Sequence, residues 1–596
     1  MIVMKKIIKK NRDILWLIKP YWVYSKAYFI LSLLFWMIVV PLSRILLVIF
    51  PSQVMSALDS DASWGQILWF VIIFQCVLLL IPLLEDAYMH FVENIATTKV
   101  ELQIKRNVYM QALKTDFKYI DDPDYYDKYQ WAIDQHTAKS SEAFSFVNRI
   151  LSAVVVVVSL VSIIAENNFI IVLLCMAGMV IRTLVSIRYN RVDMKMEEEF
   201  VPVDRKLEYT RRLFYLKDFS ADLKSTSLKE YLFKNYDAMR QKKIALQKKY
   251  GKSFFIWSAI SDVVYRIIMI AIILLIAYNI YIGNILGSAT YITMMLAVEK
   301  LDNYLFELFD LIKSGDRLQL YGVKIREFFE VDSIIETSTE NVAAHPGSGA
   351  FSVEFHNVGF QYPNSGFRIH NMNLHIKAGE KIAIVGRNGV GKSTLVKLLM
   401  RFYDVDEGRI SIDGKDIRTF DVDEYRGRVG AAFQNSNIYA MTFEENMSLY
   451  GNVTDETLQA VIDKTGLSHV LEKNQATLTT EITKEFDEAG IELSGGEIQK
   501  MAIARLLTRD FGLLLFDEPS SALDPISEYE MTKLIMDSSN RTTTIIIAHR
   551  LSTIRNVDRI IVMAEGTIKE VGTHDELMQA RGEYYDMFAK QAENYY

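Results

Sequence analysis

Apolar stretches long enough to cross a lipid bilayer constrain this 596-residue chain more than any other feature. A spanning helix needs about 20 mostly apolar residues to cross about 30 Å of hydrocarbon. Five stretches meet this requirement, at about residues 28–50, 66–84, 146–165, 168–189 and 263–282. The N-terminal half is therefore expected to be a bundle of membrane-spanning helices.

A sixth stretch, at about residues 289–312, is interrupted by Glu299, Lys300, Asp302 and Glu307. It can be interpreted as a sixth span or as an amphipathic helix in the cytoplasm. The C-terminal half has the composition of a soluble domain and should lie on the same side as the N-terminus. An even number of crossings achieves this, so six spans are favoured.

Lys and Arg are concentrated in the first 26 residues and in the loops at about 90–141 and 190–253, whereas the loops at about 51–63, 166–168 and 283–288 contain none. Because cytoplasmic loops carry the excess of Lys and Arg, the N-terminus and both long loops are expected in the cytoplasm. These loops have helical patterns at about 92–115, 194–217 and 229–249, with breaks at 119–124 and 217–222. We therefore expect the spanning helices to extend into the cytoplasm and to end in short turns.

Charge and cysteine content exclude several classes of function. The net charge of -7 and the pI near 5.9 argue against a general nucleic-acid binder, whose footprint is basic. Cys76 and Cys175 are the only cysteines, which excludes a disulfide framework and a Cys-rich metal site.

Arg44, Arg182, Asp262 and Arg266 fall within or near the spans, where charges usually pair or face an aqueous cavity. Arg44, beside Pro41, is the best candidate for lining a pore, and an interface position is the alternative for Arg182 and Arg266.

A polar, small-residue segment at 337–349 is typical of a linker, and the alternating pattern at 351–363 predicts an antiparallel strand. The apolar strand at 381–385 then leads through a glycine-rich loop into a helix at 394–400. This is the strand–loop–helix context of a phosphate-binding P-loop, in which backbone N–H groups surround phosphate oxygens. The loop and the helix start comprise Gly386, Arg387, Asn388, Gly389, Val390, Gly391, Lys392, Ser393 and Thr394.

A second apolar strand, at 513–516, ends in Asp517 and Glu518. In P-loop enzymes such a carboxylate holds Mg²⁺ beside the hydroxyl of the P-loop serine, here Ser393. The adjacent Glu518 is placed to orient or deprotonate an attacking water. The P-loop and the acidic end of the second strand together predict a nucleoside triphosphatase.

Residues 493–499, Leu-Ser-Gly-Gly-Glu-Ile-Gln, resemble the signature motif of ATP-binding-cassette (ABC) proteins. The resemblance covers about 350–590. It implies that Tyr362 stacks on adenine, that Gln434 is the Q-loop glutamine and a further Mg²⁺ ligand, and that His549 is the switch histidine. It also implies that Ser494, Gly495, Gly496, Glu497 and the D-loop residue Asp524 contribute to the nucleotide site. Glu497 stands where Gln is usual, and Asp487 where Gly is commoner.

The membrane half resembles that of ABC exporters, and residues 117–127 resemble the first cytoplasmic loop of bacterial peptide and bacteriocin exporters. The resemblance implies a half-transporter with ATP and Mg²⁺ as cofactors and Glu518, His549 and Gln434 as catalytic residues. Two chains would meet head to tail, so that each ATP lies between one P-loop and the other chain's signature motif. A homodimer is the simpler arrangement, and a heterodimer is the alternative.

The expected fold is thus an α-helical transmembrane domain with six spans and long cytoplasmic extensions, fused to an α/β P-loop ATPase domain. The expected bounds are 1–330 for the membrane domain, 331–350 for the linker and 351–596 for the ATPase. The expected function is ATP-driven export across a bacterial inner membrane, with a peptide as one candidate cargo and no peptidase domain to process it. A lipid or hydrophobic-drug exporter, an importer and an ATP-gated regulatory module are the alternatives.

Overall fold

The computed structural model describes residues 2–596 apart from 60–62, 121, 217–218, 284–287, 332–334, 336–348, 363–365, 435, 520–524, 539–541, 549 and 594–596. It divides into two compact units. One comprises Met1–Met110 with Asp127–Glu330, and the other Gln111–Tyr126 with Val331–Tyr596. The predicted linker at 337–349 lies outside the described residues except for Gly349.

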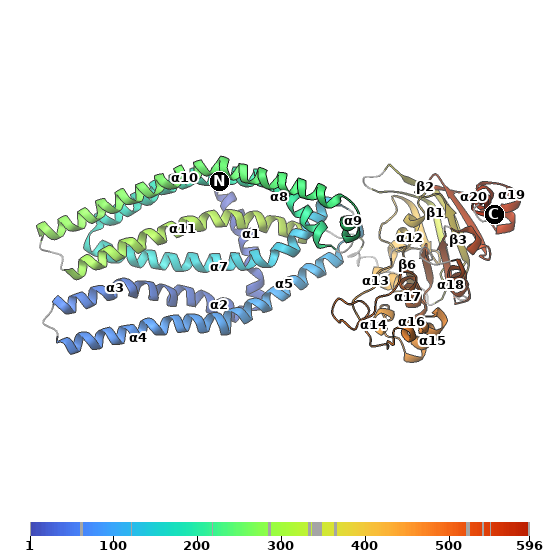
Figure 1. Ribbon diagram of the computed structural model, residues 1–596, viewed down its shortest axis with the longest axis horizontal. Helices are drawn as coiled ribbons and strands as arrows, with labels where there is room; N and C mark the ends of the chain where they lie inside the picture. Colours follow the sequence, from blue (N-terminus) through green and yellow to red (C-terminus); the bar gives the residue numbers. More distant parts are fainter. Residues whose placement is uncertain are drawn as a thin grey trace. The chain divides into compact units, whose positions relative to one another are not determined.

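The N-terminal half consists of long helices. The axes of α3, α4, α7, α8, α10 and α11 lie roughly along one line of direction, and α1 crosses them (Figure 1). The elements are α1 (Ile2–Tyr24), α2 (Lys26–Leu34), the π-helix η1 (Phe35–Val39), α3 (Val40–Asp59), α4 (Trp64–Tyr88), the π-helix η2 (Met89–Glu93), α5 (Asn94–Lys114), α7 (Pro123–Asn167), α8 (Phe169–Tyr215), α9 (Ser220–Ser225), α10 (Leu228–Gly283) and α11 (Ser288–Phe329).

Within the described residues, five helical segments are long and apolar enough to cross a membrane: Lys26–Leu58, Trp64–Lys114, Lys128–Asn167, Phe169–Tyr215 and Leu228–Tyr278. The five strongest predicted spans fall in these segments. The predicted cytoplasmic extensions are also helical over 94–114 in α5, 194–215 in α8 and 229–249 in α10, as continuations of the spans. The predicted sixth span lies within α11, which does not pass the same test of hydropathy and charge, so that span stays a prediction.

Ion pairs to neighbouring helices hold α11 in the bundle in spite of its acidic residues. Arg182 of α8 contacts Asp302 at 2.6 Å, and Arg149 of α7 contacts Glu307 at 2.8 Å. Such pairing offsets part of the cost of placing charges among apolar helices. This explains why a segment with a weak hydropathy signal still packs as a long helix.

The ATPase half begins with a four-stranded antiparallel sheet in the order β2-β1-β4-β5. Its strands are β1 (Val353–Gln361), β2 (Arg368–Ile376), β4 (Glu407–Ile412) and β5 (Lys415–Asp416). The antiparallel strand predicted at 351–363 is therefore confirmed as β1. Alternate residues are buried over 353–356 of β1 and over 372–376 of β2, which explains the alternation in the sequence there.

A six-stranded sheet in the order β10-β9-β3-β8-β7-β6 carries the predicted P-loop and acidic strands. Its strands are β10 (Thr567–Gly572), β9 (Arg559–Ala564), β3 (Lys381–Gly386), β8 (Thr543–Ile547), β7 (Leu513–Asp517) and β6 (Val429–Ala432). All neighbours pair in parallel except β10, which is antiparallel to β9. Ile547 pairs with both Ile384 and Asp517, so the carboxyl ends of β3, β8 and β7 lie together.

The helices around these sheets are α12 (Lys392–Leu399), the 3₁₀-helix η4 (Ile417–Thr419), α13 (Val422–Arg426), α14 (Phe443–Met447), α15 (Asp455–Thr465), α16 (Ser468–Lys473), α17 (Gly495–Leu507), α18 (Pro525–Ser538), the 3₁₀-helix η5 (Leu551–Ile554), α19 (His574–Ala580) and α20 (Glu583–Glu593). Helix α12 packs in the apolar core shared by the two sheets. Helices α14 to α17 enclose a separate apolar core.

The short helix α6 (Phe117–Ile120) belongs to the same unit as the ATPase half. The Phe117 ring stacks on Phe402 with centroids 4.8 Å apart, and the Lys397 ammonium lies 5.5 Å from the centroid of the same ring. The Asp116 carboxylate also accepts a hydrogen bond from the Ile335 backbone at 3.0 Å. The segment around α6 is thus packed on the sheet-containing half by apolar and polar contacts.

Candidate nucleotide-binding site

The loop between β3 and α12 adopts a backbone that only glycine accommodates without strain at several positions. Gly386, Gly389 and Gly391 have φ values of 150°, 82° and 100°. A Cβ on Gly386 would lie 2.3 Å from the Met563 carbonyl oxygen, so any other residue would force the backbone apart. Consecutive N–H groups can therefore converge here at the N-terminus of α12, which favours a bound phosphate.

The Lys392 side chain folds back across this loop and is 6% exposed. Its ammonium donates to the carbonyl oxygens of Gly386 at 2.9 Å and of Arg387 at 3.1 Å. Burial lowers the pKa of Lys392, while the nearby charges of Glu518 and Asp517 act in the opposite direction. The ammonium is thus a buried cation at the mouth of an anion-binding loop.

Strand β7, which ends in Asp517, brings oxygen ligands to the P-loop. The Ser393 hydroxyl donates to Asp517 Oδ1 at 3.1 Å, which joins α12 to the end of β7. A hydroxyl and a carboxylate suit Mg²⁺, which prefers oxygen ligands and keeps several waters. Among the described residues, no group of three or more His, Cys, Asp or Glu side chains could hold a metal on its own. The pair therefore fits a Mg²⁺ that also takes ligands from phosphate and water.

Glu518 directly follows Asp517 and has a φ of 54°, in the left-handed region that a non-glycine residue rarely occupies. Its backbone N–H donates to the Ile547 carbonyl at 3.0 Å, which fixes the turn against β8. Strained backbone of this kind is concentrated at functional sites. The turn places Glu518 among the residues that line a cavity beside the P-loop.

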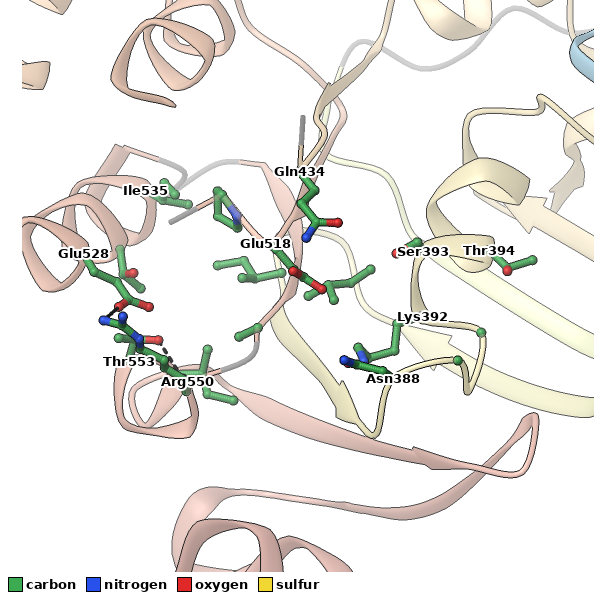
Figure 2. Close-up of a pocket in the computed structure, with 18 of the residues that line it drawn as sticks. Asn388, Lys392, Ser393, Thr394, Gln434, Glu518, Glu528, Ile535, Arg550 and Thr553 are labelled. Carbon is green, nitrogen blue, oxygen red and sulfur yellow. Dashed lines mark hydrogen bonds and ion pairs between the residues drawn. The ribbon is translucent and has the colours of Figure 1, made fainter. Parts of the chain in front are cut away.

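This cavity has a volume of about 670 Å³, enough for a nucleotide-sized ligand. Figure 2 shows Gln434, Glu518 and Lys392 around one space, with Glu528, Arg550 and Thr553 on its other side. Gln434, which follows β6, and Asn388 of the loop also line it. The structure therefore brings together the predicted residues from the ends of β3, β6 and β7.

An aromatic group borders the same cavity. Tyr362 lines it, and the Tyr362 hydroxyl lies 3.4 Å from Thr394 Oγ1. The Tyr362 ring packs edge-on against Tyr403, with centroids 5.3 Å apart. A supported aromatic ring beside the P-loop can stack on a nucleobase, as the sequence predicts.

The signature motif forms the start of α17. Ser494 is the N-cap, and the Glu497 carboxylate accepts a hydrogen bond from the Ser494 backbone at 2.7 Å. Burial acts to raise the pKa of Glu497, but the hydrogen bonds from Ser494 and the charges of Lys473 and Lys500 together lower the pKa. None of the described residues that line the cavity comes from 494–497. This segment is therefore separate from the P-loop cavity of its own chain.

Two predicted residues, Asp524 and His549, lie outside the described residues. The sequence interpretation also missed Glu528 and Arg550, which form an ion pair at 2.5 Å and line the cavity. Arg550 directly follows His549, so its position was a usable signal. Glu528 gives no such signal, because its place in the cavity depends on how α18 packs.

Comparisons with known proteins agree with this geometry. Residues 369–521 match the family model described as ABC transporter. The chain is 33% identical to the subtilin transport ATP-binding protein SpaT of Bacillus subtilis over 67% of this chain and 66% of that protein. It is 40% identical to the putative multidrug export ATP-binding/permease protein YgaD of Bacillus subtilis over 40% of this chain and 41% of that protein.

It is also 32% identical to the ATP-dependent lipid A-core flippase of Escherichia coli K12 over 56% of this chain and 57% of that protein. The matched regions thus span from less than half to just under two thirds of these relatives. The fold and the site define an ATP-binding-cassette ATPase domain joined to a helical membrane domain. Residues 369–521 thus belong to the ABC transporter family, and the three relatives, named as a transport protein, an export protein and a flippase, match 40% to 67% of the chain.

Proposed function

We propose that this chain is one half of an ATP-driven exporter in a bacterial inner membrane, with its N-terminus and its ATPase domain in the cytoplasm. Residues 1–330 would form the six-span membrane domain, 331–350 the linker and 351–596 the ATPase domain. The convergence of Lys392, Ser393 and Glu518 on one cavity is the observation that carries the proposal.

In this proposal the P-loop N–H groups and Lys392 bind the phosphates while Tyr362 stacks on the adenine. Ser393, Gln434 and Asp517 would hold Mg²⁺, which neutralises charge on the phosphate oxygens. Glu518 orients the attacking water and accepts its proton, and His549 contacts the γ-phosphate. The strained Glu518 backbone fixes the direction of this carboxylate before ATP binds.

Two chains are needed because the segment 494–497 does not line the cavity of its own chain. We propose a homodimer in which this helix start faces the γ-phosphate bound by the partner, with Asp524 aligning the two sites. ATP would hold the two ATPase domains together, and hydrolysis would release them. The helix α6, stacked on Phe402 through Phe117, would transmit this change to α5 and α7.

A peptide is the proposed cargo. The match to the subtilin transport protein extends over 415 residues, which is more than the ATPase half alone and includes part of the membrane half. The match to the lipid A-core flippase keeps a lipid cargo as the second candidate. The two candidates differ in what should accumulate inside cells when transport stops.

The test compares the peptides and lipids outside and inside cells that make the wild-type chain or Glu518→Gln. A defined peptide that is lost from the medium and retained in the mutant cells would support peptide export. A lipid that is redistributed instead would support the second candidate. Identical profiles in a host that carries the chain's own neighbouring genes would contradict export.

A further inference from the structure

One buried ion pair in the membrane half has features that bundle stability alone does not require. Arg182 of α8 and Asp302 of α11 contact each other at 2.6 Å, with side chains 15% and 19% exposed. They lie 13 and 14 residues from the starts of their helices, which at about 1.5 Å per residue places both about 20 Å along. With the predicted spans beginning at about 168 and 289, that depth would be inside a hydrocarbon layer about 30 Å thick.

The Arg182 guanidinium lies close to two aromatic rings. Its Cζ is 5.0 Å from the Tyr265 ring centroid and 4.8 Å from that of Phe306. Tyr265 belongs to α10 and Phe306 to α11, so three helices define the position of the group. Two nearby rings stabilise the cation and restrict the positions that the guanidinium can take.

The hydrogen-bonding capacity of Arg182 is only partly used. A guanidinium has five N–H donors, and the contact with Asp302 engages one nitrogen, Nη1. Within the described part of the chain, Nε is buried and has no hydrogen-bond acceptor. A buried donor without a partner is costly, so its retention points to a partner that is present only at some stage.

A small cavity of about 10 Å³ adjoins this group, enough for a single water molecule. Its lining combines the ion pair with apolar and aromatic side chains, namely Met179, Arg182, Thr183, Asp302, Leu305, Phe306 and Phe309. All of these residues come from α8 and α11. The cavity therefore lies where these two helices meet, and a relative movement of α8 and α11 would enlarge it.

We propose that Arg182 is a cargo-binding residue whose guanidinium captures a carboxylate attached to an apolar group, in exchange for Asp302. A guanidinium binds a carboxylate through two parallel hydrogen bonds, and an edge that includes Nε presents the required pair of donors. The rings of Tyr265 and Phe306 contact the apolar part. Asp302 keeps the cation paired in the absence of cargo. This inference rests on the proposed export function.

A carboxylate beside an apolar chain can belong to a peptide C-terminus or to a fatty acid. Four labelled probes distinguish these sources: acetyl-Leu-Leu-Phe with a free carboxylate, its C-terminal amide, dodecanoate and dodecanamide. Binding is measured to the full-length chain in lipid nanodiscs without ATP. Binding can then succeed or fail independently of hydrolysis and export, so this test is separate from that of the proposed function.

The variants Arg182→Gln and Asp302→Asn give opposite expected results. Arg182→Gln should weaken binding of the acid probe by about ten- to a hundredfold, the loss expected for charge-assisted hydrogen bonds. Asp302→Asn removes the competing carboxylate and should tighten binding of the same probe. Arg149→Gln is the matched control, because the Arg149–Glu307 pair also joins two bundle helices but is more exposed.

The proposal is supported if one acid probe binds more tightly than its amide, with weaker binding in Arg182→Gln and tighter binding in Asp302→Asn. The acid that is preferred then shows whether the carboxylate belongs to a peptide C-terminus or to a fatty acid. Arg182→Lys serves as the second variant should Arg182→Gln not fold. It keeps the charge but loses the planar fork, so it should weaken binding by less than Arg182→Gln is expected to. Equal binding of acids and amides, absence of binding, or weakened binding in Asp302→Asn would overturn the proposal, because the pair would then serve only to hold the helices together.

Discussion

At the P-loop, Lys392 donates to two carbonyl oxygens of its own loop, and these bonds hold the ammonium where a phosphate would arrive. Replacing Lys392 by Ala removes the cation but leaves the glycine backbone unchanged. We expect ATP affinity to fall by about ten- to a hundredfold, because hydrogen bonds to charged groups contribute about 1.5–3 kcal/mol. Equilibrium titration with a fluorescent ATP analogue measures the change.

The control for this change is Lys397→Ala, since Lys397 also lies on α12 but is not among the residues that line the cavity. Its ammonium lies over the rings of Phe117 and Tyr362. Its loss should therefore have a much smaller effect on ATP affinity. Equal losses for the two lysines would contradict the role given to Lys392.

Tyr362 gives a second prediction for a single residue. Tyr362→Ala should weaken ATP binding by about tenfold, since stacking of a base on an aromatic ring contributes about 1–3 kcal/mol. Tyr362→Phe keeps the ring and should retain most of the affinity. Titration with ATP and with inorganic triphosphate separates the effects, because only the nucleotide should lose affinity. Equal losses for the two ligands would show that Tyr362 acts on the loop instead.

Among the elements, the helices α14 and α17 are joined by one buried side chain. Arg505 of α17 donates to the Asn446 and Asn437 backbone carbonyls and to Asn446 Oδ1, each at 2.7 Å. Replacing Arg505 by Met removes its donors from the Asn446 and Asn437 backbone carbonyls, at about 1–3 kcal/mol for each buried acceptor left without a donor. We expect faster hydrogen exchange in α14 and α17 and a lower unfolding temperature.

The neighbouring Arg509 provides the control for Arg505. It donates to the Tyr450 carbonyl at 2.8 Å from an exposed position. Arg509→Met should therefore change stability by no more than about 0.5 kcal/mol, as for most surface substitutions. A similar loss in both variants, measured by hydrogen-exchange mass spectrometry, would show that burial of Arg505 is not what holds the two helices.

The elements also show what could be predicted from the sequence. Strand β3, the loop and α12 were predictable because apolar periodicity and glycines are local signals. Helix α12 nevertheless begins at Lys392 and not at the predicted Thr394, because Gly391 adopts a φ of 100° and caps the helix earlier. The pairing of Asp302 with Arg182 was not predictable, since it depends on how two distant helices pack.

In the candidate site, too, residues in local motifs were predictable and residues placed by packing were not. Lys392, Ser393, Gln434, Asp517 and Glu518 are brought together as the motifs imply, because parallel strands place their carboxyl ends at one edge of a sheet. Glu528 lines the cavity because of how α18 packs and carries no motif, whereas Arg550 directly follows the predicted switch histidine. The predicted trans role of Ser494 concerns a second chain and stays a proposal.

For the whole molecule, we predict that two chains join around ATP. One chain would carry Asn388→Cys and its partner Ser494→Cys, both with the native cysteines Cys76 and Cys175 replaced and with Glu518→Gln to slow hydrolysis. A disulfide between the chains should form with ATP and not without it, because the nucleotide bridges the two surfaces. Gel electrophoresis without reductant detects the pair.

The control for this cross-link places both cysteines in one chain and mixes it with an excess of chain that has none. Dilution should reduce the cross-link, as expected for a bond between chains. A cross-link that is independent of dilution would place the signature segment near the P-loop of its own chain and would contradict the proposed dimer.

The central claim is that hydrolysis at this site, with Glu518 as the base, powers the membrane half. The most direct test measures phosphate release and ATP binding by the purified full-length chain and by Glu518→Gln in lipid nanodiscs. We predict unchanged ATP binding and a fall in hydrolysis by about 10²–10⁴-fold, the contribution of general base catalysis. Hydrolysis at the wild-type rate in Glu518→Gln would contradict the account.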